Sequence, residues 1–493
     1  MIAVLVAVPL LFAFLTALTI PVRMEKYAKY LFLAGALLPW FVYLALGEGS
    51  GVVGNWPRVG GIEVALDAYN SLLILGELIL FSAVALYSIS YFKREVKALV
   101  LLLLVHASLL GAFISRDLFN FYIFMEIASV SSFALVGLSG ERRATRAAYK
   151  YLMLSLLASY FFVFSIGVIY LKTGYLNLEL ISRVPPSAEI RAAVALALAS
   201  LLLKAGIFPL HLWLPDAHAN APSPVSALLS GAVVKAPAYG MVLLSLYLPL
   251  SRTFREVLLG TAFASMLFGV AMALLQKDVK RLLAYHTVSQ MGYVLLGIGT
   301  LNPLGAVYYA FAHMLFKGGL FLSAGAMVDK AKSRKLEKLS YRGDPLLMLS
   351  TLMLSLAIGG IWPFVGSPAK AVLLKGLPYG KELFYLAGLG TLASFTKLNY
   401  YLMHGEGGRS GALVLPSFMM ALAALLAGIS LGAVPKAIDA YLLLGGVLLF
   451  TLLKASGLLE VKLPKREITP KDVNIGAALF ALFLLLLLHL SQG

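Results

Sequence analysis

The stretch that decides the fold, residues 190–209, reads IRAAVALALASLLLKAGIFP. It has the length of a bilayer-spanning helix, about 20 residues, and carries two charged side chains, Arg191 and Lys204. Such runs recur along the 493 residues, of which 60% are hydrophobic and 13% charged. Soluble domains carry about 25% charged residues, so the sequence predicts a polytopic membrane protein. Continuous apolar runs joined by short loops do not fit a membrane β-barrel, and the expected fold is all-α.

Sixteen apolar segments are predicted to be helices, of which fourteen form the expected transmembrane core. The twelfth contains a break and is open to being two half-helices, and the last two are the least typical spans. The expected ranges are 2–20, 27–46, 69–92, 97–115, 117–138, 147–172, 190–209, 223–249, 256–276, 280–300, 303–328, 346–373, 380–403, 412–431, 437–456 and 472–490. Residues 1–20 lack the basic start and the cleavage site of a signal peptide, so the first segment is expected to remain as a helix.

The basic residues of the loops predict the topology. The chain has 40 Lys and Arg against 23 Asp and Glu, a net charge of +17, and 33 of the basic residues fall in loops. Loops after odd-numbered segments hold 23 of them, including the run 330–342, and loops after even-numbered segments hold ten. The positive-inside rule then places the odd loops in the cytoplasm and the N-terminus outside. Because the basic residues are spread over short loops, nucleic acid is not an expected partner.

The remaining seven basic residues lie inside apolar segments, and all are lysine. They are Lys150, Lys204, Lys235, Lys317, Lys370, Lys397 and Lys454. A charge at mid-bilayer costs about 3 kcal/mol, and a desolvated ammonium, unlike a guanidinium, can lose its proton. The alternative is snorkelling near a helix end, which is favoured for Lys454 and left open for Lys150. For the lysines that lie deeper or beside helix breaks, a functional role is favoured.

Acidic residues inside the apolar segments are rarer still: Glu77 and Glu126. Glu126 lies near the centre of segment 117–138 and needs a cation, because a buried carboxylate is costly unless it is paired. Lys204 is the expected partner. For Glu77, packing or a contact with a partner subunit is favoured.

Three pairs of these lysines repeat at a nearly constant spacing. The pairs are Lys150 and Lys317 (167 residues apart), Lys204 and Lys370 (166), and Lys235 and Lys397 (162). This spacing predicts two homologous halves of five segments, 97–250 and 251–405, flanked by 1–96 and 406–493. Because five is odd, the second half is expected to be inverted relative to the first, as in many transporters.

Helix breaks support the same division. The seventh segment is interrupted by Gly206 and Pro209, and the twelfth between Gly359 and Pro368, with Pro363 inside that interval. Gly and Pro interruptions at corresponding places in two halves point to an ion site, and simple kinks are the alternative. A lysine beside each break favours the ion site.

Histidines extend the series. His313 and Lys317 are four residues apart and share a helix face, and His286 lies among hydroxyl side chains; both histidines are predicted to belong to a proton relay. His211, Asp216 and His218 lack the tight spacing of metal ligands, so no metal site is predicted. His106 and His404 have no polar partner that the sequence identifies.

The chain has no cysteine, which excludes thiolate-held clusters, and no cofactor is expected in it.

Residues 208–218, FPLHLWLPDAH, and 221–231, APSPVSALLSG, form the most specific motif. Further matching stretches are 150–151, 276–285, 289–292 and 313–317. Over roughly residues 70–400 the sequence resembles the antiporter-like subunits of complex I, of Mrp-type cation/proton antiporters and of membrane-bound hydrogenases. The resemblance implies fourteen core helices in two inverted five-helix bundles, a hydrated midplane axis for ions, and a multi-pass place in the cell membrane of a prokaryote.

The resemblance also implies roles for matching positions. These are Glu126 as the helix-5 glutamate, Lys204 as its helix-7 partner, Lys235 as the helix-8 link, His313 and Lys317 as the helix-11 step, and Lys370 as the terminal helix-12 lysine. Two departures stand out: the run VGSPAK at 365–370 lacks the usual phenylalanine before its lysine, and His286 stands where many relatives carry serine.

The sequence therefore predicts an ion-translocating subunit that moves protons, sodium or both through a buried Glu/Lys/His relay. Its expected partners are other integral membrane subunits and lipid, with peripheral redox subunits coupled indirectly and no redox chemistry in this chain. Two alternatives stay open. An independent solute transporter predicts a midplane pocket of substrate size, and a non-conducting scaffold predicts no hydrated axis between the lysines.

Overall fold

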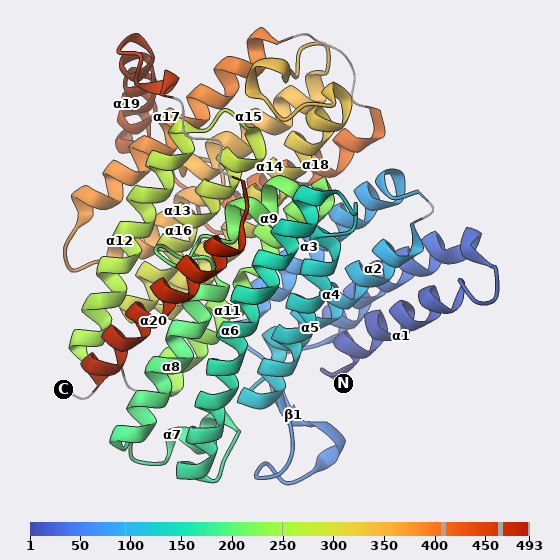
Figure 1. The fold of residues 1–493 in the computed structure, drawn as a ribbon, viewed down its shortest axis with the longest axis vertical. Helices are drawn as coiled ribbons and strands as arrows, with labels where there is room; N and C mark the ends of the chain where they lie inside the picture. Colours follow the sequence, from blue (N-terminus) through green and yellow to red (C-terminus); the bar gives the residue numbers. More distant parts are fainter. Residues whose placement is uncertain (94, 249, 406–410, 462–466, 492–493) are drawn as a thin grey trace.

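The computed structural model describes residues 1–93, 95–248, 250–405, 411–461 and 467–491. Most of this chain forms helices packed side by side in one bundle (Figure 1). Each of the sixteen predicted segments contains a helix, with ends that differ by a few residues from those expected. Five basic loop residues that entered the topology prediction lie outside the described residues: Arg94, Arg409, Lys462, Lys465 and Arg466.

The N-terminal part consists of three long helices and a hairpin. Its elements are α1 (Val4–Leu18), η1 (Glu25–Tyr27), α2 (Ala28–Ala45), β1 (Gly49–Val52), η2 (Val53–Asn55), β2 (Glu63–Leu66) and α3 (Ser71–Tyr91). The strands are antiparallel and pair Gly49 with Leu66. The all-α prediction therefore missed one short hairpin, because four-residue strands in a Gly-rich loop leave no alternating pattern to detect.

The next two groups of helices correspond to the predicted halves. The first group is α4 (Val96–Ile114), α5 (Leu118–Val136), α6 (Arg142–Thr173), α7 (Leu178–Ser182), α8 (Ala188–Lys204), α9 (Leu214–Asn220), α10 (Ser223–Leu228), the π-helical turn η3 (Leu229–Val233) and α11 (Lys235–Tyr247). The second is α12 (Arg252–Leu275), α13 (Val279–Gly299), α14 (Pro303–Ala331), η4 (Leu336–Lys338), α15 (Pro345–Gly359), α16 (Gly366–Lys375) and α17 (Lys381–His404). The homology and inversion of the two halves stay predictions.

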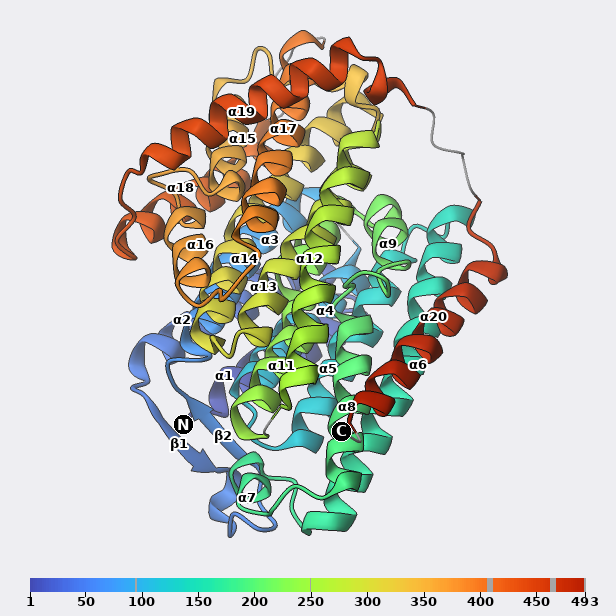
Figure 2. The same ribbon diagram turned by 90° about the vertical axis from the view of Figure 1, so that its left-hand side faces the viewer.

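The C-terminal part contacts both groups. It contains η5 (Gly411–Val414), α18 (Leu415–Ser430), α19 (Ala437–Ala455), η6 (Leu458–Glu460) and α20 (Pro470–Ser491). Helix α19 packs along α17, whereas α20 lies on α6 and α8 (Figure 2). The rings of Phe161 and Phe480 lie 5.3 Å apart at this second contact. The chain end thus crosses from the second group to the first.

Among the described residues, ten helical stretches are long and apolar enough to cross a membrane, and three apolar helices are shorter: α1, α15 and α18. The apolar window of Ser223–Tyr247 is 100% buried and that of Pro303–Ala331 is 94% buried, whereas that of Ala437–Ala455 is 11% buried. The helices that carry Lys235, His313 and Lys317 therefore form the centre of the bundle.

Both predicted helix breaks are present. Helix α8 ends at Lys204, and Gly206 adopts a left-handed backbone (φ +67°) before α9 begins. Helix α15 ends at Gly359, Gly360 is left-handed (φ +83°), and α16 begins at Gly366. Pro363 lies in this second break, but Pro368 lies in the first turn of α16, where proline is tolerated because its missing N–H has no helical partner to lose.

A third interruption was not predicted. The segment expected at 223–249 contains the π-helical turn Leu229–Val233, which ends just before Lys235. A π turn adds one residue to a helical loop without requiring Gly or Pro. Gly231 lies within this turn, but a single glycine without a proline does not by itself predict an interruption.

Helices α12 and α13 approach closely through glycines. A Cβ atom on Gly269 would lie 2.5 Å from the backbone nitrogen of Ser289, and one on Gly292 would lie 2.7 Å from the carbonyl oxygen of Ala262. Small residues allow this backbone contact between membrane helices. The contact positions His286 on α13 against the rest of the bundle.

The substitution Gly269→Ala is expected to destabilise the protein by about 1–3 kcal/mol, the usual result of overpacking. Gly260→Ala is the matched control, because it lies in the same helix and a Cβ there meets nothing within 4 Å. Heating the purified variants and measuring the monodisperse fraction by size-exclusion chromatography tests this. Equal thermal midpoints for the two variants would contradict the packing argument.

Candidate functional site

The predicted partners Glu126 and Lys204 are in contact. The Lys204 Nζ atom lies 2.8 Å from Glu126 Oε1 and also donates to Ser155 Oγ (3.0 Å) and Ser129 Oγ (3.3 Å). The Ser159 hydroxyl donates to the same carboxylate oxygen at 2.7 Å. Helices α5, α6 and α8 thus converge on one ion pair, whose lysine side chain is 3% exposed and whose glutamate is 18% exposed.

A small cavity adjoins this ion pair. Its volume is about 10 Å³, roughly the space that one water molecule needs. Ser129, Tyr151, Lys204, Val233 and Ala236 are among the residues that line it. Lys204 and residues on either side of Lys235 in the sequence therefore line the same cavity.

Lys235 and His313 share a hydrogen bond between Nζ and Nδ1. Lys235 also donates to the carbonyl oxygen of Ser230, which lies in the π turn. Both side chains are fully buried, and the described residues offer His313 Nε2 no hydrogen-bond partner. The unpredicted π turn thus supplies the acceptor that holds the lysine, in keeping with the frequent place of such turns at functional sites.

Lys317 and His286 continue the series on α14 and α13. Lys317 donates to the carbonyl oxygen of Leu283 and lies 4.9 Å from the centre of the Phe321 ring. The Nε2 atom of His286 lies 2.8 Å from Ser394 Oγ. The side chains of Lys317, His286 and Ser394 are all fully buried.

Hydroxyl groups join α13 to the π turn. Thr287 and Ser230 are 2.7 Å apart through their side-chain oxygens. Since Ser230 also accepts from Lys235 through its carbonyl, the π turn contacts both the lysine and the helix that carries His286.

Lys370 occupies the second helix break. Its Nζ atom donates to the carbonyl oxygens of Gly359 (2.7 Å) and Ile358 (3.3 Å) and lies 5.3 Å from the centre of the Tyr293 ring. These carbonyls have no helical partner because α15 ends there, and the negative end of the helix dipole favours a cation. The break therefore makes the binding position of Lys370.

Lys150, for which the sequence leaves snorkelling and function open, is in an ion triad. Its Nζ atom lies 2.8 Å from Asp216 Oδ2, and Arg281 lies 2.9 Å from Asp216 Oδ1. Asp216, for which the sequence predicts no role as a metal ligand, is paired with these two cations. The triad joins α6, α9 and α13.

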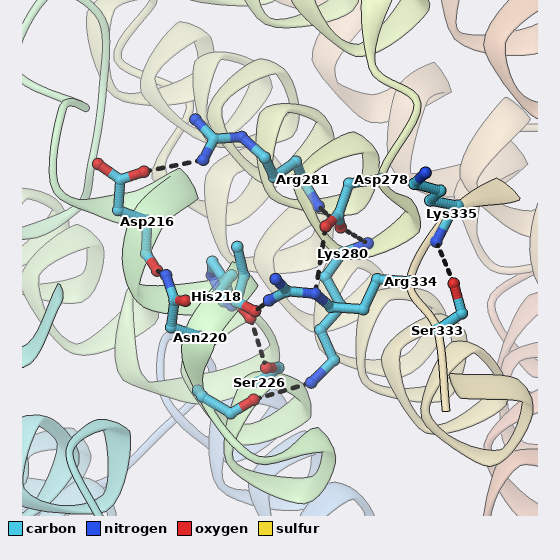
Figure 3. Close-up of polar contacts among 12 residues, drawn as sticks. Asp216, His218, Asn220, Ser226, Asp278, Lys280, Arg281, Ser333, Arg334 and Lys335 are labelled. Carbon is cyan, nitrogen blue, oxygen red and sulfur yellow. Dashed lines mark hydrogen bonds and ion pairs between the residues drawn. The ribbon is translucent and has the colours of Figure 1, made fainter. Parts of the chain in front are cut away.

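A polar cluster extends this triad along the start of α13. Figure 3 shows the side chains of Lys280, Arg281 and Arg334 reaching residues of the segment 214–226, which includes Asp216. Lys280 donates to the carbonyl oxygen of Ala221 at 2.8 Å. Arg334 donates to the carbonyl oxygen of Ala219 and forms an ion pair with Asp278. These contacts hold the segment that follows the first helix break.

Lys397 and Lys454 differ from the other lysines. Lys397 donates to the carbonyl oxygens of Leu274 and Gln276, both at 2.6 Å, at the C-terminal end of α12. Its contacts are those of a helix cap, and a part in the relay stays a prediction. Lys454 is exposed and lies 3.7 Å from the centre of the Tyr400 ring, the arrangement expected of a snorkelling side chain.

One buried acid–base pair was missed. Glu77 Oε2 lies 2.7 Å from His106 Nδ1, both side chains are 0% exposed, and the imidazole stacks on Phe81 at 4.0 Å. His106 was judged to have no companion, since nothing in the sequence shows which faces of α3 and α4 meet. A second missed feature is His218, whose two ring nitrogens have no hydrogen-bond partner among the described residues.

Asp216→Asn is expected to lower the stability by about 3 kcal/mol or more, because it leaves two cations beside a neutral side chain in a largely buried position. Glu189→Gln is the control: its pair with Lys172 is exposed on both sides, and exposed pairs contribute little to stability. Thermal unfolding of the purified variants measures both. An equal loss of stability in the two variants would show that the triad contributes no more than an exposed ion pair.

A multi-helix membrane bundle with a central series of buried lysines and histidines defines a class of ion-handling membrane proteins. Residues 115–396 match the model of the family described as NADH:quinone oxidoreductase/Mrp antiporter, TM. The chain belongs to this family. The matched range contains the Glu126–Lys204 pair and continues through Lys370.

Relatives of known sequence agree with this assignment. The chain is 32% identical to NADH-quinone oxidoreductase subunit N of Desulforudis audaxviator, over 74% of each protein. It is 29% identical to a Na(+)/H(+) antiporter subunit of Alkalihalophilus pseudofirmus, over 72% of this chain and 76% of that protein.

The fold is similar to a chain of the membrane-bound sulfane sulfur reductase, an archaeal respiratory membrane complex (TM-score 0.79, 22% identity, 97% of this chain and 99% of that one). It is also similar to a chain of the Mrp complex from Dietzia sp. (TM-score 0.75, 24% identity, 93% and 98%).

Proposed function

We propose that this chain is an ion-translocating subunit of a larger membrane complex and that it moves protons along its buried series of side chains. The observation that carries this proposal is the Glu126–Lys204 ion pair, followed inward by further buried lysines that have neutral acceptors. The relatives named as an NADH-quinone oxidoreductase subunit and a Na(+)/H(+) antiporter subunit support it. Whether sodium also moves is left to experiment.

The ion pair controls whether Lys204 keeps or releases its proton, at one end of the proposed relay. While Glu126 is ionised, it holds the charged form of Lys204 at 2.8 Å. Protonation of Glu126, or a cation brought near it, removes this attraction. Lys204 can then release its proton toward the small cavity that it lines beside Val233 and Ala236.

The Lys235–His313 contact acts as the next step. One hydrogen bond between two nitrogen bases holds one proton, because a second proton would place two positive charges side by side. A proton that arrives on Lys235 therefore drives one onward from the pair. Lys317 and His286 offer the following positions, and Lys370 ends the series.

Neighbouring subunits are proposed partners. Glu126 is partly exposed on a face of α5 where Phe119 is 44%, Ile123 40% and Val130 49% exposed. Lys204 and Ser159 hold one oxygen of this carboxylate, and its exposed part lies on an apolar face that another membrane subunit can cover. A partner subunit that covers this face can couple its own movements to the ion pair.

The proposed topology is the one that the basic loops predict, with the N-terminus outside and the run 330–342 in the cytoplasm. A solute transporter is not favoured, because relatives of this chain are named as subunits of an NADH-quinone oxidoreductase and of a Na(+)/H(+) antiporter.

Lys204→Ala and Lys204→Arg, made in the intact complex, are expected to lower ion translocation by at least about tenfold, the factor that 1.4 kcal/mol in a barrier produces. Alanine removes the proton carrier, and arginine keeps the charge but does not release its proton. The measurement is proton movement across membrane vesicles that contain equal amounts of assembled complex.

Lys454→Ala is the control, because Lys454 is exposed and outside the relay; it is expected to leave translocation unchanged. Unchanged translocation in both Lys204 variants, with normal assembly, would disprove the relay.

A further inference from the structure

The relay ends at Lys370, and a cavity of about 270 Å³ begins there. Ser367, Lys370 and Ala371 of α16 form one wall, and Asp439 and Lys436 at the start of α19 form another. This cavity is many times larger than the one beside Lys204, and its volume is enough for several water molecules. Helix α19 lies beyond the range 115–396 that matches the family model.

Asp439 belongs to this cavity by position. It lies in the first turn of α19 and is half-buried. Its Oδ2 atom accepts a hydrogen bond from the backbone N–H of Trp362 at 3.3 Å. Trp362 lies in the break between α15 and α16, so Asp439 is held against the same break whose carbonyls hold Lys370.

The cavity lies near the loops of the side assigned as the outer one. Asn302, in the loop before α14, donates to the carbonyl oxygen of Val372 at 3.0 Å, and Gly376 adjoins the same asparagine. Residues 300–302 and 376–380 follow even-numbered predicted segments, opposite the basic run 330–342. Lys375 and Lys436 are exposed at this end.

We propose that Asp439 accepts the proton that leaves Lys370 and releases it to the outer side, which makes α19 the exit element of the relay. This inference rests on the proposed function. In the step, the Lys370 ammonium loses a proton through water in the cavity, and the Asp439 carboxylate gains it. Asp439 then loses the proton to the outer solution, and Lys370 is protonated again from the interior.

The charges around the cavity explain why a carboxylate is needed there. Lys375 and Lys436 also line the cavity and repel a proton that enters it. Asp439 is the acidic residue of this lining, so it offers the proton a position that the cations do not. Without it, a proton leaving Lys370 enters a cavity lined by cations.

The absence of cysteine from the chain allows a direct test of access. The substitution Ala371→Cys, at a partly exposed residue that lines the cavity, is expected to react in the assembled complex in intact cells with a membrane-impermeant methanethiosulfonate reagent added outside. Leu373→Cys is the control: it is 1% exposed, lies on the same helix and does not line the cavity. It is expected to stay unreacted.

Adding Asp439→Asn to the Ala371→Cys variant tests the charge. Asparagine keeps an oxygen acceptor for the Trp362 N–H but removes the negative charge. The rate with a cationic reagent, relative to an anionic one, is expected to fall severalfold. Reaction from the cytoplasmic side alone, no reaction at all, or an unchanged rate ratio would each overturn the exit.

Translocation separates this inference from the proposed function. Asp439→Asn is expected to slow proton release severalfold in the assembled complex, with recovery in Asp439→Glu. If Lys204→Ala abolishes translocation while Asp439→Asn leaves it intact, the exit is wrong and the relay stands. If Lys204→Ala has no effect, the proposed function fails, and the cysteine accessibility still decides whether the cavity opens outward.

Discussion

The rest of the structure depends on one constraint: an ammonium group inside an apolar bundle must find an acceptor. Burying an unpaired charge costs several kcal/mol, so each internal lysine fixes the position of whatever faces it. Lys204 meets a carboxylate, Lys235 an imidazole and a carbonyl, and Lys370 two carbonyls. These acceptors differ in charge. Lys204 is therefore held tightly as a cation by the Glu126 carboxylate, whereas Lys235 and Lys370 are held by neutral groups.

Interrupted helices supply most of the neutral acceptors. A helix end or an extra residue in a turn frees a carbonyl to face a side chain, whereas Lys317 donates to the carbonyl of Leu283 inside α13. The π turn before Lys235 frees the carbonyl of Ser230, and the end of α15 frees that of Gly359. In the same way, the end of α12 frees the carbonyl of Leu274, which accepts a hydrogen bond from Lys397. Backbone irregularity and buried charge are therefore two parts of one arrangement, and the breaks lie where the proposed relay needs them.

Hydropathy and residue type were enough to predict the spans, both Gly-containing breaks and the contact between Glu126 and Lys204. Other pairs could not be predicted. Glu77 and His106 lie on different helices, and their contact depends on how α3 and α4 are rotated about their axes, which an almost uniformly apolar sequence does not encode as a periodic pattern. Asp216 illustrates the same point, because its partners come from elements 66 and 65 residues away.

The sequence alone determined that this chain is a helical membrane protein, which side chains are out of place in its apolar segments, and through its motifs the family that the comparisons then showed. Those conclusions follow from transfer free energies and local spacing, which are properties of single segments. Only the tertiary structure decided which acceptor each lysine meets, where the π turn frees a carbonyl, and that Asp439 of α19 returns to the break beside Lys370. Contacts between segments depend on helix rotation and chain path, and these are settled by packing of the whole bundle.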